Sequence, residues 1–464
     1  MSAQAIYITH FLGFVAGVFL LMRPVAADDE RWEWRLAGKL AVIAAMALFL
    51  LVKSETHWIL HDFRVAYYSA GVAIQDGPQG LALEIERGVE GFVNLPIVAY
   101  LFWPFGALSD QVASLLHAVF GLVCILAAWW LLVRLLSLGQ QQALLLLFIF
   151  AANGPIVYSF KEGNLSHMLL LLFVVAFIWL RNGRQFGAGI LLGLAALIKP
   201  PLLALGAYFL FRRNWRVVAG GALFCTLAVA LSVVIFGWEM HLRWYELCIK
   251  PFGKNPMGAY NVQSIPAFLL RLQLGPENKL FVWKTHSLGV PFAVLSGLLV
   301  AAIWISVLWV LLRSSMRMAI GKQPAPLATE LEFMMVIAAI CVTSPVSWSH
   351  YYSWFLLPAA FFVSNQIVAW RKTVFRYIGW IGLLLLATPV LRIYWRNEWL
   401  YLAYTYVGVS LMLAGGLIWF ALLGIARYRL VQRSDVVAPH SHFPNGDLPA
   451  REFVPVSNRQ LQHE

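Results

Sequence analysis

Long runs of apolar residues, separated by short loops rich in arginine and lysine, dominate the pattern of the chain. A helix that crosses a bilayer needs about 20 such residues, or somewhat fewer where interfacial residues help. The runs predict eleven crossings, near residues 3–22, 37–52, 111–133, 142–160, 164–180, 217–237, 289–312, 331–347, 351–369, 376–393 and 403–425. The pattern therefore predicts an all-α polytopic membrane protein.

One apolar stretch does not fit a simple crossing. Residues 186–211 are about one span long, yet Arg184 and Arg212 on either side of them belong on the same side of the membrane. Lys199 and the two prolines after it divide the stretch into two runs, and each run is too short to cross alone. We expect a re-entrant or short-helix hairpin, which is tolerated only where protein or a water-filled cavity surrounds it.

The composition supports a membrane location and excludes several other classes. Of the 464 residues, 61% are hydrophobic and only 12% are charged, whereas soluble domains carry about 25% charged residues. The net charge of +12 does not require a nucleic-acid partner, because cytoplasmic loops of membrane proteins carry excess lysine and arginine. The four cysteines show neither metal-ligand spacing nor a disulfide framework. Residues 1–22 contain no lysine or arginine, so we expect no cleavable signal peptide.

The loops rich in arginine and lysine give a consistent orientation of the chain in the membrane. If these loops lie in the cytoplasm, the N-terminus is outside and the C-terminus is inside. We expect one transmembrane domain over residues 1–433 and a disordered, polar, cytoplasmic tail over 434–464. The segments that would lie together on the outer face are 53–94, 161–164, 238–288, 343–352 and 394–402.

The segment Thr343–Tyr352 is unusually polar for a turn between two apolar runs. It contains four aliphatic hydroxyls, a proline, three aromatic side chains and the imidazole of His350. Polar groups at a membrane boundary cost free energy and often mark a site. Trp348 and Tyr351 can stack on a flat polar ligand. His350 could carry a proton, bind a phosphate or donate a structural hydrogen bond.

Two charged residues are candidates for chemistry on the same face. Asp62 follows the second span among aromatic residues; burial there can raise its pKa and make it a general base. It could equally be an interfacial aspartate paired with His61 or Arg64. Lys199, between Ile198 and Pro200 at the apex of the hairpin, needs an anion such as a carboxylate or a phosphate, unless it snorkels to the interface.

Amide side chains and one arginine complete the candidate set. Asn164 opens a span and could place a helix N-terminus against a phosphate or sugar, although ordinary capping also explains it. Asn261 and Gln263 lie in the largest outer loop, where they could bind a sugar. Arg271 follows them and could bind a phosphate. Ordinary loop chemistry would account for this group as well.

Four stretches of the chain, in this order and spacing, resemble one known family. They are Asp62–Gly71, Ala188–Pro200 (similar to AGxLLGLAxxxKP), Asn261–Ile265 (close to NQSL, with one extra residue) and Thr343–Tyr352 (similar to SPxSWxHxY). Together they resemble the GT-C superfamily, and most closely glycosyltransferase family 87, which uses polyprenyl-phosphate sugars and includes mannosyltransferases. The chain departs from the family at Ser349, where an acidic or amide residue is common, and it meets a Gly-Gln-x-Asn pattern only loosely at Gly163 and Asn164.

The resemblance implies an inverting transfer of a hexose, most plausibly mannose, or a pentose from a polyprenyl-phosphate donor to a lipid or glycan acceptor. It implies that Asp62 deprotonates the acceptor hydroxyl, while Lys199, Arg271 and His350 hold the donor phosphate. Asn164, Asn261, Gln263, Trp348 and Tyr351 would then contact the sugar or the acceptor. Neither a metal nor another cofactor is implied. The expected location is the bacterial inner membrane, with the site facing outside.

Other functions share part of this pattern. A lipid-linked-sugar flippase or transporter would also have many spans and polar groups within the membrane. Its polar residues would trace a path through the bilayer, whereas those of this chain gather on one face, and no internal repeat is visible. An oligosaccharide ligase or polymerase, or a GT-C relative without activity, also remains compatible with the sequence.

Overall fold

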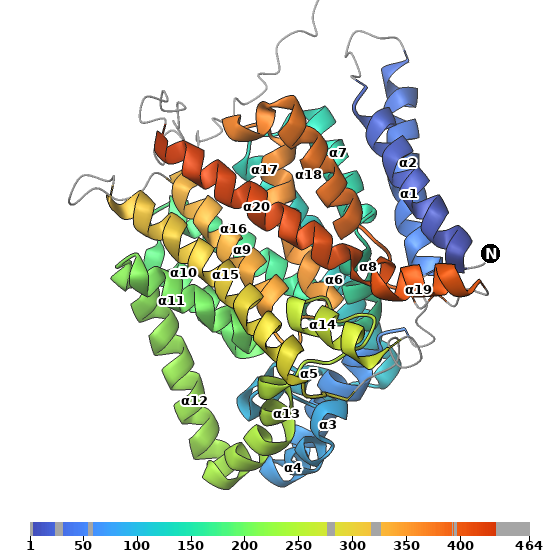
Figure 1. The fold of residues 1–464 in the computed structure, drawn as a ribbon. Helices are drawn as coiled ribbons and strands as arrows, with labels where there is room; N and C mark the ends of the chain where they lie inside the picture. The colour runs from blue at the N-terminus through green and yellow to red at the C-terminus, as the bar shows by residue number, and fades with distance from the viewer. Residues whose placement is uncertain are drawn as a thin grey trace, which may run out of the picture.

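The computed structural model describes residues 3–23, 31–53, 59–275, 284–316, 326–391, 393 and 397–432. These residues fold almost entirely into helices (Figure 1); they form no extended strand, only two isolated β-bridges. The predicted all-α membrane protein is therefore confirmed. The tail predicted over 434–464 lies outside the described residues.

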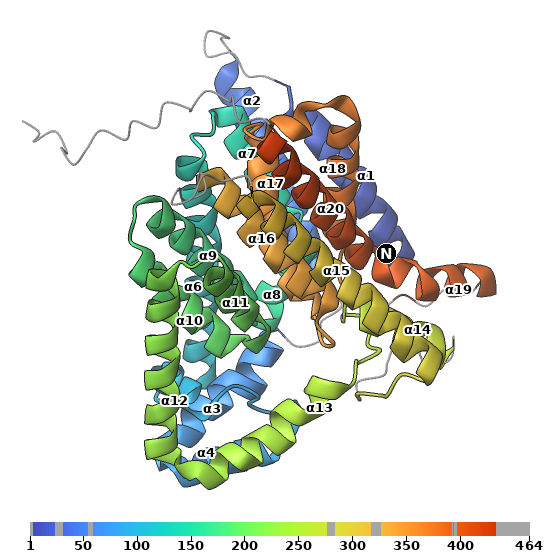
Figure 2. The same ribbon diagram turned by 60° about the vertical axis from the view of Figure 1, so that its left-hand side comes forward.

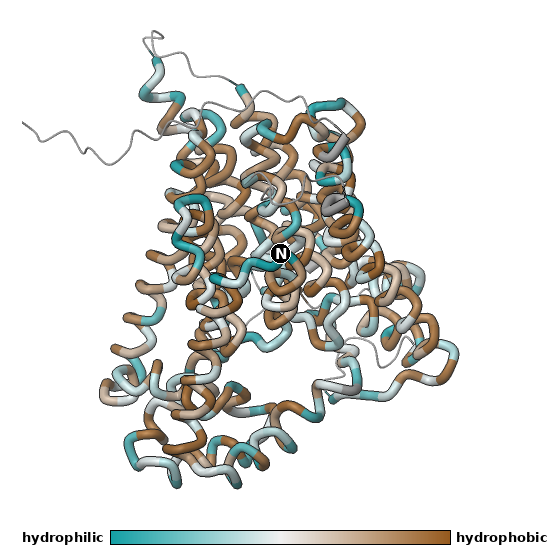
Figure 3. The backbone as a smooth tube through the Cα atoms, turned by 90° about the vertical axis from the view of Figure 1, so that its left-hand side faces the viewer, coloured by the Kyte–Doolittle hydropathy of each residue, from teal (hydrophilic) through white to brown (hydrophobic). Residues whose placement is uncertain are grey.

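Seven helices of the described residues are long and apolar enough to cross a membrane. They are α1 (Ala3–Leu21), α2 (Trp32–Lys53), α6 (Asp110–Leu135), α12 (Trp215–Trp244), α15 (Val290–Met316), α16 (Pro326–Thr343) and α20 (Leu411–Gln432), the last continuing from α19 (Glu398–Tyr406). Hydrophobic residues dominate these helices, whereas hydrophilic residues are concentrated in the connections (Figure 3). This distribution is the one expected for helices surrounded by lipid.

The other four predicted crossings are shorter or broken. Residues 142–160 form α7 (Gln140–Ala151) and α8 (Gly154–Glu162), which meet at an angle of 55° and count as an eighth span only if taken together. Residues 164–180 form α9 (Ser166–Arg181) and residues 376–393 form α18 (Thr373–Leu386). Residues 351–369 divide into η8 (Ser349–Phe355) and α17 (Leu356–Val363).

The break between α7 and α8 shows why run length misjudges such spans. Asn153 accepts a hydrogen bond from the backbone N–H of Ile156 (2.9 Å) and so caps a new helix, with Pro155 in its first turn. Gly154 packs so closely on the carbonyl of Thr388 that a Cβ would lie 2.1 Å from its oxygen. Apolar residues lie on both sides of Asn153, Gly154 and Pro155, but these three residues start a new helix.

The predicted hairpin is present. It consists of α10 (Gln185–Ile198), the 3₁₀ turn η5 (Pro200–Leu202) and α11 (Leu203–Phe211). Gly189 of α10 lies against Val217 of α12, and Gly193 lies against Gly221, so α10 and α12 run in the same direction. The intervening α11 must therefore run back, and Lys199 lies at the apex. Figure 2 shows the three helices next to one another.

Three arginines from separate basic loops meet at one end of the bundle. Arg181 forms an ion pair with Glu330 at the start of α16. Glu332, two residues further along the chain, accepts hydrogen bonds from the Nε atoms of Arg212 and Arg427, each at 2.7 Å. This agrees with the sequence-based placement of the three loops on one side of the membrane.

At the other end, short elements join the predicted outer segments. They are η1 (Phe63–Tyr68), α3 (Ser69–Ala73), η2 (Ile74–Asp76), α4 (Pro78–Glu86), η3 (Gly88–Glu90), η4 (Pro96–Leu101), α5 (Trp103–Gly106), η6 (Tyr245–Ile249), α13 (Lys250–Lys254) and α14 (Ile265–Leu274). Two further 3₁₀ turns lie outside this group. The turn η9 (Val368–Arg371) lies beside α18 and α20, and η10 (Gly408–Ser410) lies beside α19 and α20.

The core of the bundle lies around α16. All of its residues from Leu331 to Thr343 are buried. The helix α12 is the opposite case, because most of its apolar side chains, such as Val234 at 82% exposed, point outward. A peripheral helix with an apolar outer face fits a lipid environment.

Candidate active site

A close contact between two loops positions Asp62. Gly163 ends α8 with a left-handed backbone (φ 70°), a conformation that glycine adopts without steric cost. A Cβ on Gly163 would lie 2.6 Å from the Cβ of Phe63. The backbone N–H of Leu60 donates to the carbonyl of Lys161 (2.7 Å) and ties the loops together. Gly163 thus allows the segment that carries Asp62 to lie on the turn before α9.

Asn164 holds the carboxylate of Asp62. Its Oδ1 accepts hydrogen bonds from the backbone N–H (3.2 Å) and the hydroxyl (3.0 Å) of Ser166, which begins α9. Its Nδ2 therefore faces the other way and donates to Oδ2 of Asp62 at 2.9 Å. The N-cap of α9 is Leu165, not Asn164 as ordinary capping would have it, and Asn164 instead connects the first residue of α9 to the carboxylate.

The surroundings make Asp62 a stronger base than an aspartate in water. Burial raises the pKa of Asp62, because the carboxylate loses water that would stabilise its charge. The hydrogen bond from Asn164 opposes this rise, and so do the nearby positive charges of Lys199 and, to a smaller extent, His61. The net effect is a higher affinity of the carboxylate for a proton.

Lys199 is brought to the same place by the hairpin. It is only 9% exposed, and its Nζ lies 5.1 Å from the centre of the Tyr351 ring. Asn94 donates to the carbonyl of Ile198 (2.8 Å) and so stabilises the chain reversal before the prolines. Within the described residues, the ammonium group has no hydrogen-bond acceptor. A buried cation in this state fits an anionic ligand.

The loop at 261–263 and the turn at 347–349 pair with each other. The backbone N–H of Ser349 donates to the carbonyl of Asn261 (2.7 Å), that of Gln263 donates to the carbonyl of Ser347 (2.6 Å), and Val262 forms a bridge with Trp348. Two of the stretches that carried the family resemblance are therefore one structural unit.

Several buried polar atoms of this unit lack hydrogen-bond partners among the described residues. They are Asn261 Oδ1, Gln263 Oε1, Ser347 Oγ, Ser349 Oγ and both ring nitrogens of His350. Leaving such an atom unsatisfied costs about 1–3 kcal/mol, so water or a ligand is expected there. Gln263 and Ser349 line a cavity of about 10 Å³, which is room for about one water molecule.

His350 lies between the aromatic residues of the turn. Its ring is stacked with that of Trp348 (centroids 6.2 Å apart, planes 14° apart) and meets Tyr351 edge-on at 5.2 Å. Burial lowers the pKa of His350 well below its ordinary value, and the charge of Lys199 lowers it further. The ring is therefore neutral at pH 7 and can donate or accept a hydrogen bond without bringing a positive charge.

Arg271 holds the outer loop in place. It is 1% exposed, and its Nη1 donates to the carbonyls of Ala259 (3.1 Å) and Val262 (2.7 Å). Its Nη2 donates to the hydroxyl of Ser410 (2.9 Å). These partners give Arg271 a structural role, and the predicted contact with a donor phosphate stays a prediction.

The side chain of Gln263 also has partners within the fold. Its Nε2 donates to the carbonyls of Tyr260 (2.9 Å) and Val409 (2.7 Å). Its predicted contact with a sugar or acceptor would have to use Oε1.

Sequence reasoning did not single out Glu162 and Tyr158. Glu162 is buried at the end of α8, its charge interacts with that of Asp62, and the hydroxyl of Tyr158 hydrogen-bonds to it. The same hydroxyl accepts a hydrogen bond from Nδ2 of Asn261 (3.2 Å). Glu162 lies in the outer segment 161–164, but no spacing in the sequence connects it to Asp62.

The described residues contain no group of three or more His, Cys, Asp or Glu side chains that could hold a metal ion. What they bring together is a buried base, a buried cation without an acceptor, aromatic faces and unpaired polar atoms. That set suits a reaction in which a hydroxyl loses a proton while an anionic group departs.

Comparisons with known proteins point to the same chemistry. The sequence model described as glycosyltransferase family 87 matches residues 92–345, which is more than half of the chain. A Mycolicibacterium smegmatis polyprenol-phosphate-mannose-dependent alpha-(1-2)-phosphatidylinositol pentamannoside mannosyltransferase is 25% identical over 366 residues, covering 76% of this chain and 82% of that protein.

Two further relatives are named polyprenol-phosphate-mannose-dependent alpha-(1-2)-phosphatidylinositol mannoside mannosyltransferases. The one from Mycobacterium tuberculosis is 27% identical and covers 61% of this chain and 63% of that protein. The one from Mycolicibacterium smegmatis is 25% identical and covers 89% of this chain and 96% of that protein. The similarity to one relative thus extends over most of both chains.

Proposed function

Because the chain belongs to glycosyltransferase family 87, we propose that this membrane glycosyltransferase moves mannose from a polyprenyl-phosphate donor to a hydroxyl of a lipid or glycan acceptor, with inversion. The names of the three relatives support the donor, since each is a polyprenol-phosphate-mannose-dependent mannosyltransferase. The phosphatidylinositol mannosides in those names support an acceptor that is itself a lipid carrying sugars.

In this proposal Asp62 is the general base. Asn164 holds Oδ2 at 2.9 Å, which leaves Oδ1 to receive the proton of the acceptor hydroxyl. The hydroxyl oxygen then forms a bond to the anomeric carbon of the donor sugar, from the side opposite the phosphate. The bond between that carbon and the phosphate oxygen breaks, and its electrons leave with the lipid phosphate.

Lys199 stabilises the charge of the departing phosphate. It is buried close to Asp62, and an ammonium group placed where negative charge develops lowers the barrier to departure. We place His350 beside it as a neutral hydrogen-bond donor. Trp348, Tyr351 and the unpaired oxygen of Asn261 are left to contact the sugar or the acceptor.

We also propose that the site faces outward from a bacterial inner membrane. Arg181, Arg212 and Arg427 gather at the opposite end of the bundle. Cytoplasmic loops carry the excess of basic residues, so the end with Asp62 would be outside. A lipid-linked donor would reach this site from the outer leaflet.

The observation that carries the proposal is the Asp62–Asn164 hydrogen bond beside Lys199, and changing the base tests it. Asp62→Asn should reduce transfer from a synthetic polyprenyl-phosphate mannose by about 10²-fold or more, with yield and thermal stability unchanged. Asp76→Asn, at an exposed residue of the same outer region, is the matched control. Transfer by Asp62→Asn near the wild-type rate would remove Asp62 as the base.

A further inference from the structure

A second site of different character lies at the other end of the bundle. A cavity of about 530 Å³ is enclosed between α2, the start of α7, the end of α17 and α18. The helix α7 begins at this cavity, and α8, which continues it, ends beside Asp62. The cavity is therefore separated from the candidate active site by the depth of the bundle.

Among the residues that the structure describes, the charged side chains that line the cavity are all positive. They are Lys39 and Arg376. The ammonium of Lys39, 9% exposed, donates to the carbonyl of Leu21 at the end of α1 (3.4 Å) and to that of Arg23 just beyond it. The guanidinium of Arg376 has no hydrogen-bond or ion-pair partner among the described residues. A guanidinium offers five donors, so it is available to an anion.

The start of α7 adds to the positive potential. Gln140, Gln141 and Gln142 form its first turn and line the cavity. A helix of 12 residues directs backbone N–H groups and the positive end of its dipole toward this space. Two basic side chains and the start of a helix therefore adjoin the cavity, and all three favour a negative charge.

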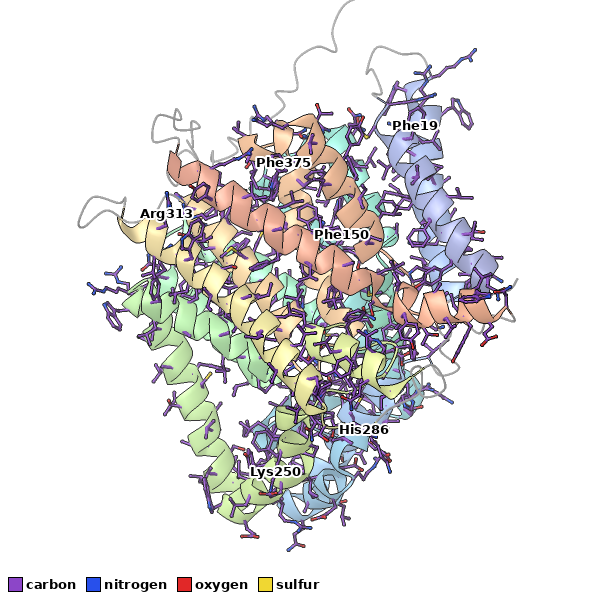
Figure 4. The ribbon with its side chains drawn as sticks, viewed as in Figure 1. Phe19, Phe150, Lys250, His286, Arg313 and Phe375 are labelled. Atoms are coloured by element: carbon purple, nitrogen blue, oxygen red, sulfur yellow. The ribbon has the colours of Figure 1, made fainter. Side chains whose placement is uncertain are left out.

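Apart from Asn365, the other side chains of the wall are apolar, and they lie beside a lipid-facing surface. Leu144, Phe362 and Trp380 line the cavity. The neighbouring hairpin of α1 and α2 exposes apolar side chains, including Phe19 at 62% (labelled in Figure 4) and Leu40 at 45%. A volume of several hundred Å³ is typical of sites for whole small ligands, and an anion with an apolar part would match both walls.

We propose that this cavity binds the phosphate-bearing headgroup of an anionic phospholipid from the leaflet on the basic side of the protein. Its phosphate would lie between Arg376, Lys39 and the start of α7, and the beginning of its acyl chains would follow Leu144 and Phe362 toward the outer surface of α1 and α2. This site is independent of sugar transfer, and it can be tested by binding alone.

The experiment measures lipid binding to the full-length protein purified in a neutral detergent. Phosphatidylglycerol, phosphatidylcholine and inorganic phosphate are titrated separately, with the shift in thermal stability and native mass spectrometry as readouts. We expect phosphatidylglycerol to stabilise the protein and to remain bound, and the other two to have little effect. Equal stabilisation by inorganic phosphate would overturn the lipid as the ligand.

Variants assign the effect to the cavity. Arg376→Gln should weaken phosphatidylglycerol binding about fivefold or more, whereas Arg134→Gln, an exposed arginine outside the cavity, should not. If the two variants lost phosphatidylglycerol binding equally, the lipid would be attracted to basic surface in general, and the cavity would be overturned as its site. If Arg376→Gln folds poorly, Arg376→Lys keeps the charge and should retain binding; its failure to do so in a folded protein would also contradict the proposal.

Discussion

Asp62 and Asn164 are separated by 102 positions in the chain, and a hydrogen bond joins their side chains. Asn164 fixes one carboxylate oxygen and lowers the pKa of Asp62, while burial raises it. The balance of these effects sets the pH at which the base becomes ionised. The side chain of Asn164 therefore connects the start of α9 to the proposed base.

Removing the amide should shift the pH dependence of transfer. Asn164→Ala deletes the hydrogen bond that favours the ionised form, so the pKa of Asp62 should rise further. Since the base must be ionised, activity is lost as the pH falls through that pKa, and the acidic limb of kcat/KM should move to higher pH. The measurement is the pH profile with synthetic donor. An unchanged acidic limb would contradict the assignment; Asn182→Ala, exposed at the basic end, is the control.

At the scale of elements, the hairpin of α10 and α11 explains how a lysine comes to be buried near Asp62. Two helices too short to cross the bilayer meet at Lys199-Pro200-Pro201. Asn94 stabilises this reversal of the chain by donating a hydrogen bond to the carbonyl of Ile198. The apex thereby places one ammonium group deep inside the protein. A continuous helix would have carried the same residue past the site.

Lys199→Met should weaken the use of the donor more than that of the acceptor. A hydrogen bond to a charged group contributes about 1.5–3 kcal/mol, so kcat/KM for the donor should fall by about 10- to 100-fold. Steady-state kinetics with each substrate varied in turn measure the difference. Lys250→Met, at an exposed lysine paired with Glu246, is the control. Donor kinetics equal to wild type would remove Lys199 from the phosphate site.

At the scale of the whole molecule, two ends of different chemistry define an orientation. One end carries the ion pairs of Arg181, Arg212 and Arg427 with Glu330 and Glu332. The other carries the short outer helices and the Asp62 site. The proposed function requires the second end to face outside.

Cysteine labelling tests this orientation directly. Asp76→Cys, at the end with Asp62, should react with a membrane-impermeant maleimide in intact cells, because the residue is exposed. Asn182→Cys, exposed at the basic end, should react only after the membrane is made permeable. Three of the native cysteines are buried and Cys225 is partly buried, so the unsubstituted protein serves as the background. The reverse pattern would place the site in the cytoplasm.

The sequence by itself determined the class of fold and the end at which the polar groups gather. Apolar runs of span length identify membrane helices because backbone polar groups must be satisfied within the helix, and the basic loops separate the two ends. The break at Lys199 was also predictable, since proline cannot continue a helix. The lengths of individual spans were predicted less well: the pattern predicts one crossing over residues 142–160, although Asn153 caps a new helix there and Pro155 lies in its first turn.

Only the tertiary structure decided which polar residues share a site. It brought Asp62, Asn164 and Lys199 together, gave Arg271 backbone carbonyls as partners, and added Glu162. These outcomes depend on contacts between residues far apart in the chain, such as the packing of Phe63 on Gly163. Sequence patterns report the local period and charge of a segment, whereas side-chain partners are set by the packing of helices against one another.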